Sequence, residues 1–299
     1  MSTDLIQRCF FLLGPTAVGK TDLAVTLAEQ VGGEILGADA YQIYRGLDIL
    51  SAKPSREIRA RVPHHLIDEV PLTQSFDVAQ YRALAMPRIA DILARGRVPI
   101  VCGGNGMYLR SLTHGLADLP PADPALRAEL EREPLPTLVE RLRQLDPEAA
   151  VDEKNPRRVI RALEICLRTG RPFSAQRAEW EHEPILHGAI LIRPREQMLE
   201  RIAARTLAMF AAGVVEEVAA VSEVGPTAGQ MLGLREIRAL LTGEGTREQA
   251  IEAITTATRR YAKRQLTWFR RERAYAWVDL SQTAHPLDEL AKLLPPGRG

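Results

Sequence analysis

The chain has 299 residues, of which 45% are hydrophobic and 26% are charged, and its formal net charge is +1; these values exclude a disordered or fibrous protein. No apolar run approaches the roughly 20 residues of a membrane span, and residues 1–4 lack the basic and apolar pattern of a signal peptide. The three cysteines, Cys9, Cys102 and Cys166, are odd in number and far apart, so we expect reduced thiols in a cytoplasmic protein with no membrane partner.

The first predicted elements enclose a glycine-rich loop. Residues 9–13 form an apolar run short enough for a buried strand, and residues 21–30 carry apolar side chains at helical spacing. The loop between them reads GPTAVGKT and fits the pattern G-x-x-x-x-G-K-[ST], which cradles phosphates. Its residues are Gly14, Pro15, Thr16, Ala17, Val18, Gly19, Lys20 and Thr21.

Each part of this loop suits a polyphosphate. Amide groups at a helix N-terminus attract an anion, Lys20 adds a positive charge, and the Thr21 hydroxyl can ligate Mg²⁺. The loop alone leaves open which polyphosphate binds and what reaction follows.

A second predicted strand, residues 34–38, runs directly into Asp39. Ligands of doubly wound sheets bind beyond the carboxyl ends of the strands, so we expect Asp39 near the phosphate loop. Its carboxylate is a candidate general base or magnesium ligand. A role as a turn or helix cap is the alternative that the residues leave open.

A predicted helix at 78–95 and a third strand at 98–102 lead into a second glycine-rich turn, GGNGMY, at 103–108. Small residues there admit close approach to the backbone, and Asn105 offers a donor and an acceptor. The alternation of strands and helices predicts an α/β fold, a P-loop NTPase-like parallel sheet with helices on both faces.

The remaining elements predict a helical insertion domain within this core. A breaker-rich passage at 115–124 precedes helical patterns at 125–133, 135–145 and 157–169. We therefore place the first part of the core at 1–116, the insertion at 117–186 and the completion of the core at 187–299. In the last part we expect a strand at 189–192 and helices at 195–221 and 247–273.

Basic residues gather in two places despite the nearly neutral total. Between 259 and 273 seven basic residues face one acid, Glu272, and between 157 and 171 five arginines face only Glu164. Such clusters suit a polyanionic partner. Solvated helix faces are the alternative.

Together these segments resemble the bacterial tRNA dimethylallyltransferases, also called tRNA isopentenyltransferases, over nearly the whole chain. The matching segments are 14–21 (GPTAVGKT), 39–54 (DAYQIYRGLDILSAKP), 62–68 (VPHHLID), 103–108 (GGNGMY), 119–127 (LPPADPALR), 155–164 (NPRRVIRALE) and 258–270 (TRRYAKRQLTWFR). Each segment is only suggestive, but their combination in this order is highly specific.

The resemblance implies a reaction. A dimethylallyl group would move from dimethylallyl diphosphate to the exocyclic N6 amine of adenine 37, immediately 3′ of the anticodon of a tRNA. The loop would hold the diphosphate, with Lys20 and Mg²⁺ on Thr21 stabilising the leaving group. Asp39 would be the general base. The partner would be the anticodon stem-loop, and we expect a monomer.

The resemblance also implies roles for single residues. It assigns Asn105 to catalysis beside Lys20 and Asp39. It assigns contact with tRNA to Asp39, Ala40, Tyr41, Gln42, Asn105, Arg127, Arg157, Arg158, Val159, Ile160, Arg161, Arg259, Lys263 and Arg264. Tyr261, Trp268 and Phe269 could stack on bases, although core packing is the favoured role for Trp268 and Phe269.

The chain departs from the family pattern at three places. Asn105 stands where most members have threonine, Ala40 replaces a common serine, and Leu50-Ser51 replaces glycine-threonine. The phosphate loop and Asp39 are intact. We therefore expect effects on rate and on the choice of prenyl donor, and the same reaction class.

Two other functions remain open from the sequence. A P-loop kinase or nucleoside-triphosphatase would use the same loop on ATP, with Asp39 on magnesium. A noncatalytic RNA-binding adaptor would keep the fold without the chemistry. GGNGMY and the basic segment 258–270 argue against the first, and the intact Lys20, Thr21 and Asp39 argue against the second.

Overall fold

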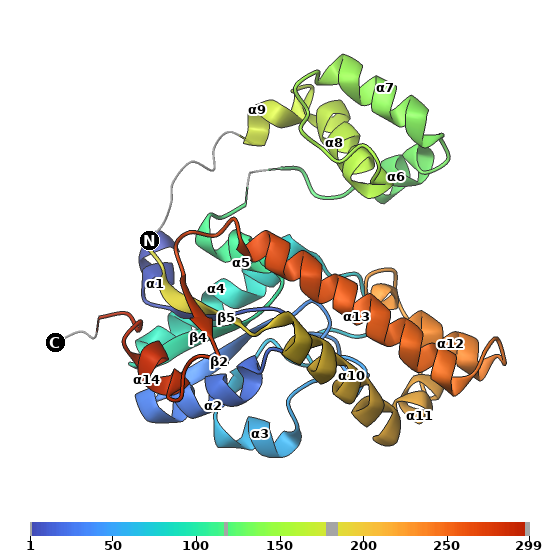
Figure 1. Ribbon diagram of the computed structural model, residues 1–299. Coiled ribbons are helices and arrows are strands. Elements are labelled where there is room, and N and C mark those ends of the chain that lie inside the picture. Colours follow the sequence, from blue (N-terminus) through green and yellow to red (C-terminus); the bar gives the residue numbers. More distant parts are fainter. Residues whose placement is uncertain (1, 117–118, 178–184, 297–299) are drawn as a thin grey trace. The chain divides into compact units, whose positions relative to one another are not determined.

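The protein is built on a six-stranded, all-parallel sheet (Figure 1). This computed structural model describes residues 2–116, 119–177 and 185–296. The strand order is β3-β2-β4-β1-β5-β6. The strands are β1 (Phe10–Leu13), β2 (Gly33–Ala38), β3 (His64–His65), β4 (Val98–Gly103), β5 (His187–Ile192) and β6 (Ala276–Asp279). The predicted α/β class and parallel sheet are confirmed.

Both faces of the sheet are covered because the central strands are apolar on both sides. In β1, Phe11 and Leu13 belong to one core cluster while Phe10 and Leu12 belong to the other, as the alternation of a strand requires. The first cluster includes residues of α1 (Ser2–Gln7), α4 (Val78–Ala94) and α5 (Gly106–Thr113), together with Phe269. The second includes residues of α2 (Lys20–Val31) and α14 (Pro286–Ala291), together with Met198.

A third core cluster joins the later helices to the segment that follows β2. The helical elements are α10 (Arg195–Ala211), α11 (Val214–Ala219), a 3₁₀ turn at Ala228–Gln230, α12 (Leu234–Leu241) and α13 (Arg247–Phe269). Leu47 and Leu50 pack into this cluster. The short helix α3 (Arg56–Arg61) follows, with Ser55 as its N-cap.

Three predicted helices were too long, including the one expected at 125–133, which ends at Leu130. The single helix expected at 195–221 is broken where Gly213 takes a φ of 93°, a left-handed conformation that separates α10 from α11. The last long helix ends at Phe269, four residues before the predicted end at 273. The short elements β3, β6, α1, α3, α12 and α14 were not predicted.

The chain divides into two compact units, described separately. Unit 1 comprises Met1–Thr113 with Pro184–Gly299, and unit 2 comprises His114–Glu183. Unit 2 contains α6 (Pro124–Leu130), α7 (Leu135–Leu145), α8 (Pro156–Thr169) and α9 (Phe173–Arg177), with a core of its own. Residues 117–118 and 178–184, part of the predicted insertion, lie outside the described residues.

No helix in the described ranges has the length and apolar character that crossing a membrane requires.

Candidate active site

The glycine-rich loop lies between β1 and α2, where the sequence placed it. Gly19, with a φ of 106°, caps α2, and a side chain at Gly14 would approach the carbonyl oxygen of Leu191 to 2.7 Å. Lys20 folds back on the loop, and its Nζ donates to the carbonyl oxygens of Gly14 and Pro15, both at 2.8 Å. The ammonium group is therefore held at the mouth of the loop.

Three arginines, one directly after β5 and two on α10, brace the same loop. The Nε atoms of Arg193 and Arg201 donate to the carbonyl oxygens of Val18 (3.0 Å) and Ala17 (2.7 Å). Arg205 donates through Nη1 to the Thr16 hydroxyl at 3.0 Å. Sequence reasoning missed all three. The available signal was the i,i+4 spacing of Arg201 and Arg205, which places them on one face of a helix just after a strand.

A cavity of about 500 Å³ opens above this loop. The residues that line it come from the loop, the end of β2, the end of β4, α10 and α13. They are Thr16, Ala17, Gly19, Lys20, Thr21, Asp22, Asp39, Gln42, Ala52, Cys102, Gly103, Gly104, Arg201, Ala204, Arg205, Ala208 and Gln265. A site with two buried cations, a helix N-terminus and one strand-end carboxylate can hold a polyphosphate and accept a proton.

Burial perturbs two of the three cations that line the cavity, Lys20 and Arg205. It lowers the pKa of Lys20 to about 8, against the opposing influence of Cys102 and Asp39. Burial also lowers the pKa of Arg205, which Asp39 partly counteracts. Removing these charges from water is costly, and a bound anion would offset that cost.

Asp39 is a turn cap and also lines the cavity, so its role as a base or magnesium ligand stays a prediction. Its Oδ1 accepts hydrogen bonds from the backbone N–H groups of Tyr41 (2.9 Å) and Gln42 (3.3 Å), which makes it a turn cap. The same side chain lines the cavity together with Lys20 and Thr21. Capping therefore fixes the carboxylate toward the cavity and does not compete with a catalytic role.

A smaller, more apolar pocket of about 60 Å³ adjoins the cavity. The two share Thr16, Asp39 and Arg205. The other lining residues of the smaller pocket are Tyr41, Leu50, Ser51, Ile202, Thr206, Met209, Met231, Leu232, Ile254, Thr258 and Tyr261. The departures at Leu50-Ser51 thus lie at this pocket, whose aliphatic lining was otherwise not predicted.

Gln265 of α13 ties the phosphate loop to the end of β4. Its Oε1 accepts from the Thr16 N–H at 2.8 Å, and its Nε2 donates to the carbonyl oxygen of Gly104 at 3.0 Å. A β-carbon at Gly104 would overlap this amide, and one at Gly106 would overlap the indole ring of Trp268. These glycines therefore admit the protein's own α13, where we expected close approach of a substrate.

Asn105 is the N-terminal cap of α5. Its Oδ1 accepts from the N–H groups of Met107 (3.1 Å) and Tyr108 (3.4 Å). Asn105 does not line the cavity, although its neighbours Gly103 and Gly104 do. Its catalytic role stays a prediction.

The aromatic residues of α13 divide as the packing argument expected. Phe269 is fully buried, Trp268 packs against the same cluster, and their rings meet edge to face at 5.2 Å. Core packing is confirmed for both. Tyr261 lines the apolar pocket, and the Arg264 guanidinium lies over its ring at 5.7 Å.

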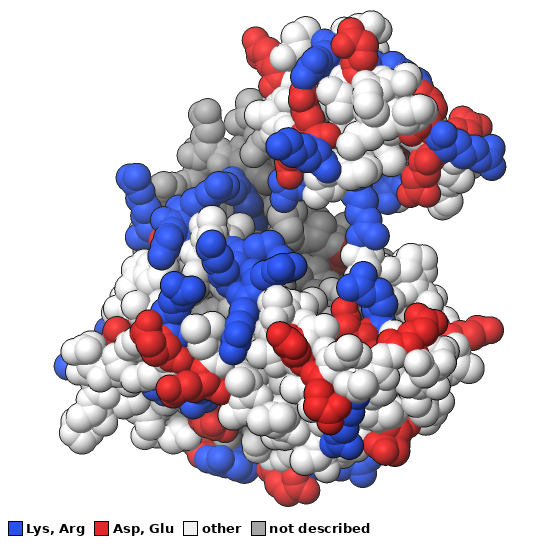
Figure 2. Space-filling view, turned by 45° about the vertical axis from the view of Figure 1, so that its right-hand side comes forward, with Lys and Arg blue, Asp and Glu red and all other residues white. Residues whose placement is uncertain are grey.

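The basic residues predicted on α13 lie on a surface. Arg259, Lys263 and Arg264 are exposed, as are Arg260 and Arg270. Figure 2 shows Lys and Arg side chains gathered on one face of unit 1. A polyanion would meet little opposing charge over these positions.

Unit 2 uses two of its predicted RNA contacts internally. The Glu164 carboxylate is fully buried and pairs with Arg127 Nη2 (2.9 Å) and Arg161 Nη1 (2.5 Å). It also accepts from the N–H of Asp123 at 2.5 Å. Both guanidinium groups remain partly exposed, so they are fixed in place and accessible.

The other residues of unit 2 that were predicted to contact RNA differ in their exposure to solvent. The side chains of Val159 and Ile160 are buried in the core of unit 2, and their predicted contact with tRNA stays a prediction. They lie on the apolar face of α8. Arg157 and Arg158 are exposed at its first turn.

Metal binding would need oxygen atoms from outside the protein. Among the described residues no group of three or more His, Cys, Asp or Glu side chains could hold a metal ion. Thr21 and Asp39 both line the cavity beside the phosphate loop. This fits Mg²⁺, which usually takes one or two protein oxygens and completes its shell with phosphate and water.

Comparison with known proteins gives one consistent family. The sequence model of the IPP transferase family matches residues 42–272. A tRNA dimethylallyltransferase of Anaeromyxobacter sp. (strain K) is 44% identical over 297 residues, which cover 96% of each chain. A tRNA dimethylallyltransferase of Deinococcus radiodurans is 46% identical, over 87% of this chain and 89% of that protein.

Solved structures agree with the sequence relatives. The tRNA isopentenylpyrophosphate transferase of Bacillus halodurans has a TM-score of 0.69 and 35% identity, with 96% of this chain and 99% of that chain covered. A eukaryotic dimethylallyltransferase acting on tRNA has a TM-score of 0.79 and 27% identity, with 92% of this chain and 75% of that chain covered. The chain therefore belongs to the IPP transferase family of tRNA dimethylallyltransferases.

Proposed function

We propose that this protein transfers a dimethylallyl group from dimethylallyl diphosphate to the N6 amine of adenine 37 in tRNA and releases diphosphate. The observation that carries the proposal is the cavity in which Lys20, Arg205 and the Asp39 carboxylate meet, beside an apolar pocket. Cations and amides suit a diphosphate, the carboxylate suits an amine that must lose a proton, and the family acts on tRNA.

The residues divide the reaction between them. The adenine N6 lone pair forms a bond to C1 of the prenyl group while the bond between C1 and the diphosphate oxygen breaks. Negative charge grows on the departing oxygen, where Lys20, Arg205 and the loop amides stabilise it. The N6 proton passes to Asp39, which Tyr41 and Gln42 hold by their N–H groups.

Mg²⁺ would be held by the Thr21 hydroxyl and by diphosphate oxygens, with Asp39 within the same cavity. Bound there, it would neutralise charge on the leaving group. Asn105 would act from its position beside Gly104, with its Nδ2 as the donor. The substitution of threonine by Asn105 would alter rate and donor preference rather than the reaction.

Both units would contribute to tRNA binding. On unit 1 the contacts would come from Asp39, Ala40, Tyr41, Gln42 and Asn105, and from Arg259, Lys263 and Arg264. On unit 2 they would come from Arg127, Arg157, Arg158 and Arg161. Adenine 37 must leave its stack to reach Asp39, as in other enzymes that modify a base.

The test uses purified protein with an unmodified tRNA substrate and either dimethylallyl diphosphate or ATP. Nuclease digestion and mass spectrometry then report the modified nucleoside. We expect the mass of one dimethylallyl group on adenosine 37 with the prenyl donor only. Hydrolysis of ATP without prenylation would instead support the P-loop nucleoside-triphosphatase that the loop alone allows.

A further inference from the structure

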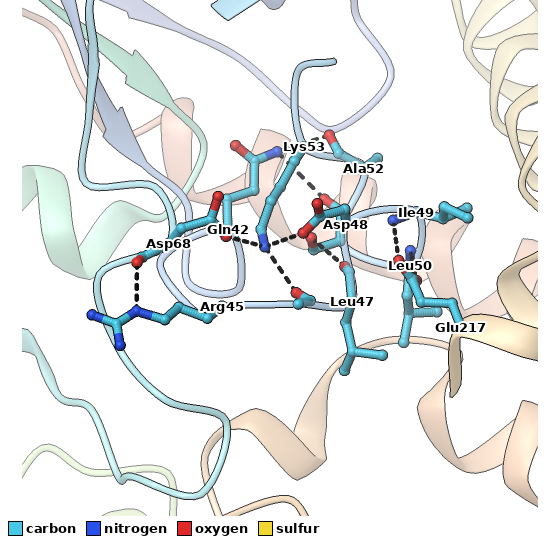
Figure 3. A network of polar contacts seen from close by, with 12 residues as sticks. Gln42, Arg45, Leu47, Asp48, Ile49, Leu50, Ala52, Lys53, Asp68 and Glu217 are labelled. Atoms are coloured by element: carbon cyan, nitrogen blue, oxygen red, sulfur yellow. Dashed lines mark hydrogen bonds and ion pairs between the residues drawn. The ribbon is translucent and has the colours of Figure 1, made fainter. Parts of the chain in front are cut away.

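The chain that follows the candidate base is folded around one buried lysine. Figure 3 shows Lys53 surrounded by polar partners from its own loop and from the next segment. Its side chain is 1% exposed. The Nζ donates to the Gly46 carbonyl oxygen (2.8 Å) and to carboxylate oxygens of Asp48 and Asp68 (both 2.6 Å). All three ammonium protons are thus used.

The segment that Lys53 holds, residues 46–53, has a backbone that would not adopt this shape unaided. Leu47 and Ala52 have φ values of 51° and 49°, and Asp68, which pairs with Lys53, has a φ of 60°. Each left-handed conformation of a residue with a β-carbon is strained and persists only where surrounding contacts enforce it. Lys53 supplies such contacts next to Leu47, next to Ala52 and at Asp68.

This segment reaches the reacting groups through Gln42. Its Nε2 donates to the carbonyl oxygens of Ser51 (3.3 Å) and Ala52 (3.0 Å). Its backbone N–H donates to the Asp39 carboxylate, and both Gln42 and Ala52 line the cavity. The peptide bond between Ala52 and Lys53, together with these hydrogen bonds of Gln42, therefore links Lys53 to the candidate base.

A second clamp holds the same segment from the other side. Glu217 of α11 accepts the backbone N–H groups of Ile49 (2.8 Å) and Leu50 (2.9 Å), one on each carboxylate oxygen. Leu50 lines the apolar pocket. Because Glu217 holds the middle of the segment, loss of the Lys53 contacts would free the part that faces Gln42 and leave Ile49 and Leu50 in place.

We propose that Lys53 is a positioning residue for the transfer reaction: through the carbonyl oxygens of Ser51 and Ala52 it fixes Gln42 and, through Gln42, the Asp39 carboxylate. The inference rests on the proposed function. It assigns to Lys53 no contact with substrate, because its three donors are all used within the protein. Positioning by Lys53 would keep the Asp39 carboxylate within hydrogen-bond reach of the N6 proton that it removes.

Lys53→Met tests the proposal, because methionine keeps most of the length and removes the donors. We expect kcat for tRNA prenylation to fall at least about tenfold, since misplacement of a catalytic group by about 1 Å can cost about a hundredfold. The Kd for dimethylallyl diphosphate should stay within about twofold, since the phosphate loop is untouched. Circular dichroism must show a folded protein at the assay temperature.

The matched control is Arg59→Met. Arg59 pairs with the other oxygen of Asp68 at 2.7 Å and so shares the ion-pair cluster, whereas Gly46 and Asp48 of the segment accept from Lys53. We expect its kcat within twofold of the unaltered protein. Equal losses of kcat in both variants, or an unchanged kcat in Lys53→Met, would overturn the proposal.

If Lys53→Met does not fold, Asp48→Asn removes one partner of Lys53 at a half-exposed position. A kcat lowered about threefold or more with unchanged diphosphate affinity supports positioning, and an unchanged kcat overturns it. The unaltered protein is assayed first. Its failure to prenylate tRNA would refute the proposed function, whereas normal prenylation with an insensitive Lys53 refutes this inference alone.

Discussion

Asp39 owes its place to two elements at once: the end of β2 aims it at the phosphate loop, and the N–H groups of Tyr41 and Gln42 fix its carboxylate. The sequence predicted the first of these from strand and loop order. It offered capping and catalysis as alternatives, and the geometry shows that one side chain can do both.

Asp39→Asn separates these two roles, because asparagine keeps an oxygen for the cap and cannot take the proton. We expect prenyl transfer to slow by about 10²–10⁴-fold, the usual contribution of a general base. Binding of dimethylallyl diphosphate should change less than about threefold. Single-turnover transfer and isothermal titration measure the two quantities, and near-normal turnover would rule out a general base at this position.

Lys20 makes diphosphate binding depend on pH. Burial lowers its pKa to about 8 in the free protein, so it is charged below that pH and neutral above it. A bound diphosphate favours the charged form and raises the pKa. The Kd for dimethylallyl diphosphate should therefore be constant below pH 8 and rise by up to about tenfold per pH unit above it.

Titration calorimetry in buffers of different ionisation enthalpy checks this, since binding near pH 8.5 should take up a proton. Lys20→Met is the control, with weaker binding that no longer changes over this range. A Kd that stays constant to pH 9.5 would contradict the assignment of Lys20 as the titrating group.

In unit 2 the charge of the arginines on α8 is partly balanced by a buried glutamate, which the sequence did not reveal. The run of arginines in 157–171 indicated a polyanion site, yet Glu164 on the same helix neutralises Arg161, and Arg127 joins from α6. Burial alone would raise the pKa of Glu164, but its hydrogen bonds to Arg127, Asp123 and Arg161 outweigh burial and hold the pKa below 4.5. The pair is therefore intact above that pH and is lost as pH falls through the folded value.

Glu164→Gln should lower the free energy of unfolding by about 2 kcal/mol at pH 7. Breaking a buried pair costs about 3–5 kcal/mol, and the cost is smaller here because both arginines keep access to water. The exposed pair of Arg143 and Glu153 provides the control, and Glu153→Gln should cost less than about 1 kcal/mol. Urea denaturation compares the two, and equal effects would mean that Glu164 is not a structural centre.

The elements that the sequence missed have physical causes. β3 has two residues, too few to show periodicity, and β6 (AWVD) lacks the longer apolar run that marked β1. The break between α10 and α11 depends on one glycine whose φ only the fold determines. The phosphate loop and β2, by contrast, carry their signals within eight or fewer neighbouring residues. Gln265 is 249 residues away from Thr16 in the sequence, so no local pattern predicts the hydrogen bond between them.

At the scale of the whole molecule, the class of fold follows from the order of strands and helices along the sequence. The order of the strands within the sheet does not. Nothing local says that β1 lies between β4 and β5, or that Arg205 therefore reaches Thr16. The candidate base and the loop were predictable because parallel strands end at one edge of a sheet. The arginines that brace the loop were not, because their place depends on the packing of α10.

The basic face of α13 predicts a salt effect. A variant with Arg259→Gln, Lys263→Gln and Arg264→Gln should bind tRNA more weakly, and the slope of log Kd against log salt should fall by about 0.7–0.9 per lost phosphate contact. The control removes the same charge at exposed positions elsewhere, with Arg56→Gln, Arg88→Gln and Lys292→Gln. Equal salt slopes in the two variants would mean that these three basic residues of α13 are only solvated and do not contact tRNA.

The phosphate loop has a different role in each of the two candidate enzymes. In a prenyltransferase it holds the diphosphate leaving group, and in a P-loop kinase or nucleoside-triphosphatase it holds the phosphoryl donor. Release of diphosphate and of inorganic phosphate, counted against prenylated adenosine in parallel reactions with and without ATP, tests this directly. We predict one diphosphate for each adenosine that gains a dimethylallyl group, with no inorganic phosphate. Phosphate release that requires ATP, with no prenylated adenosine, would contradict the assignment of Lys20 as a leaving-group anchor.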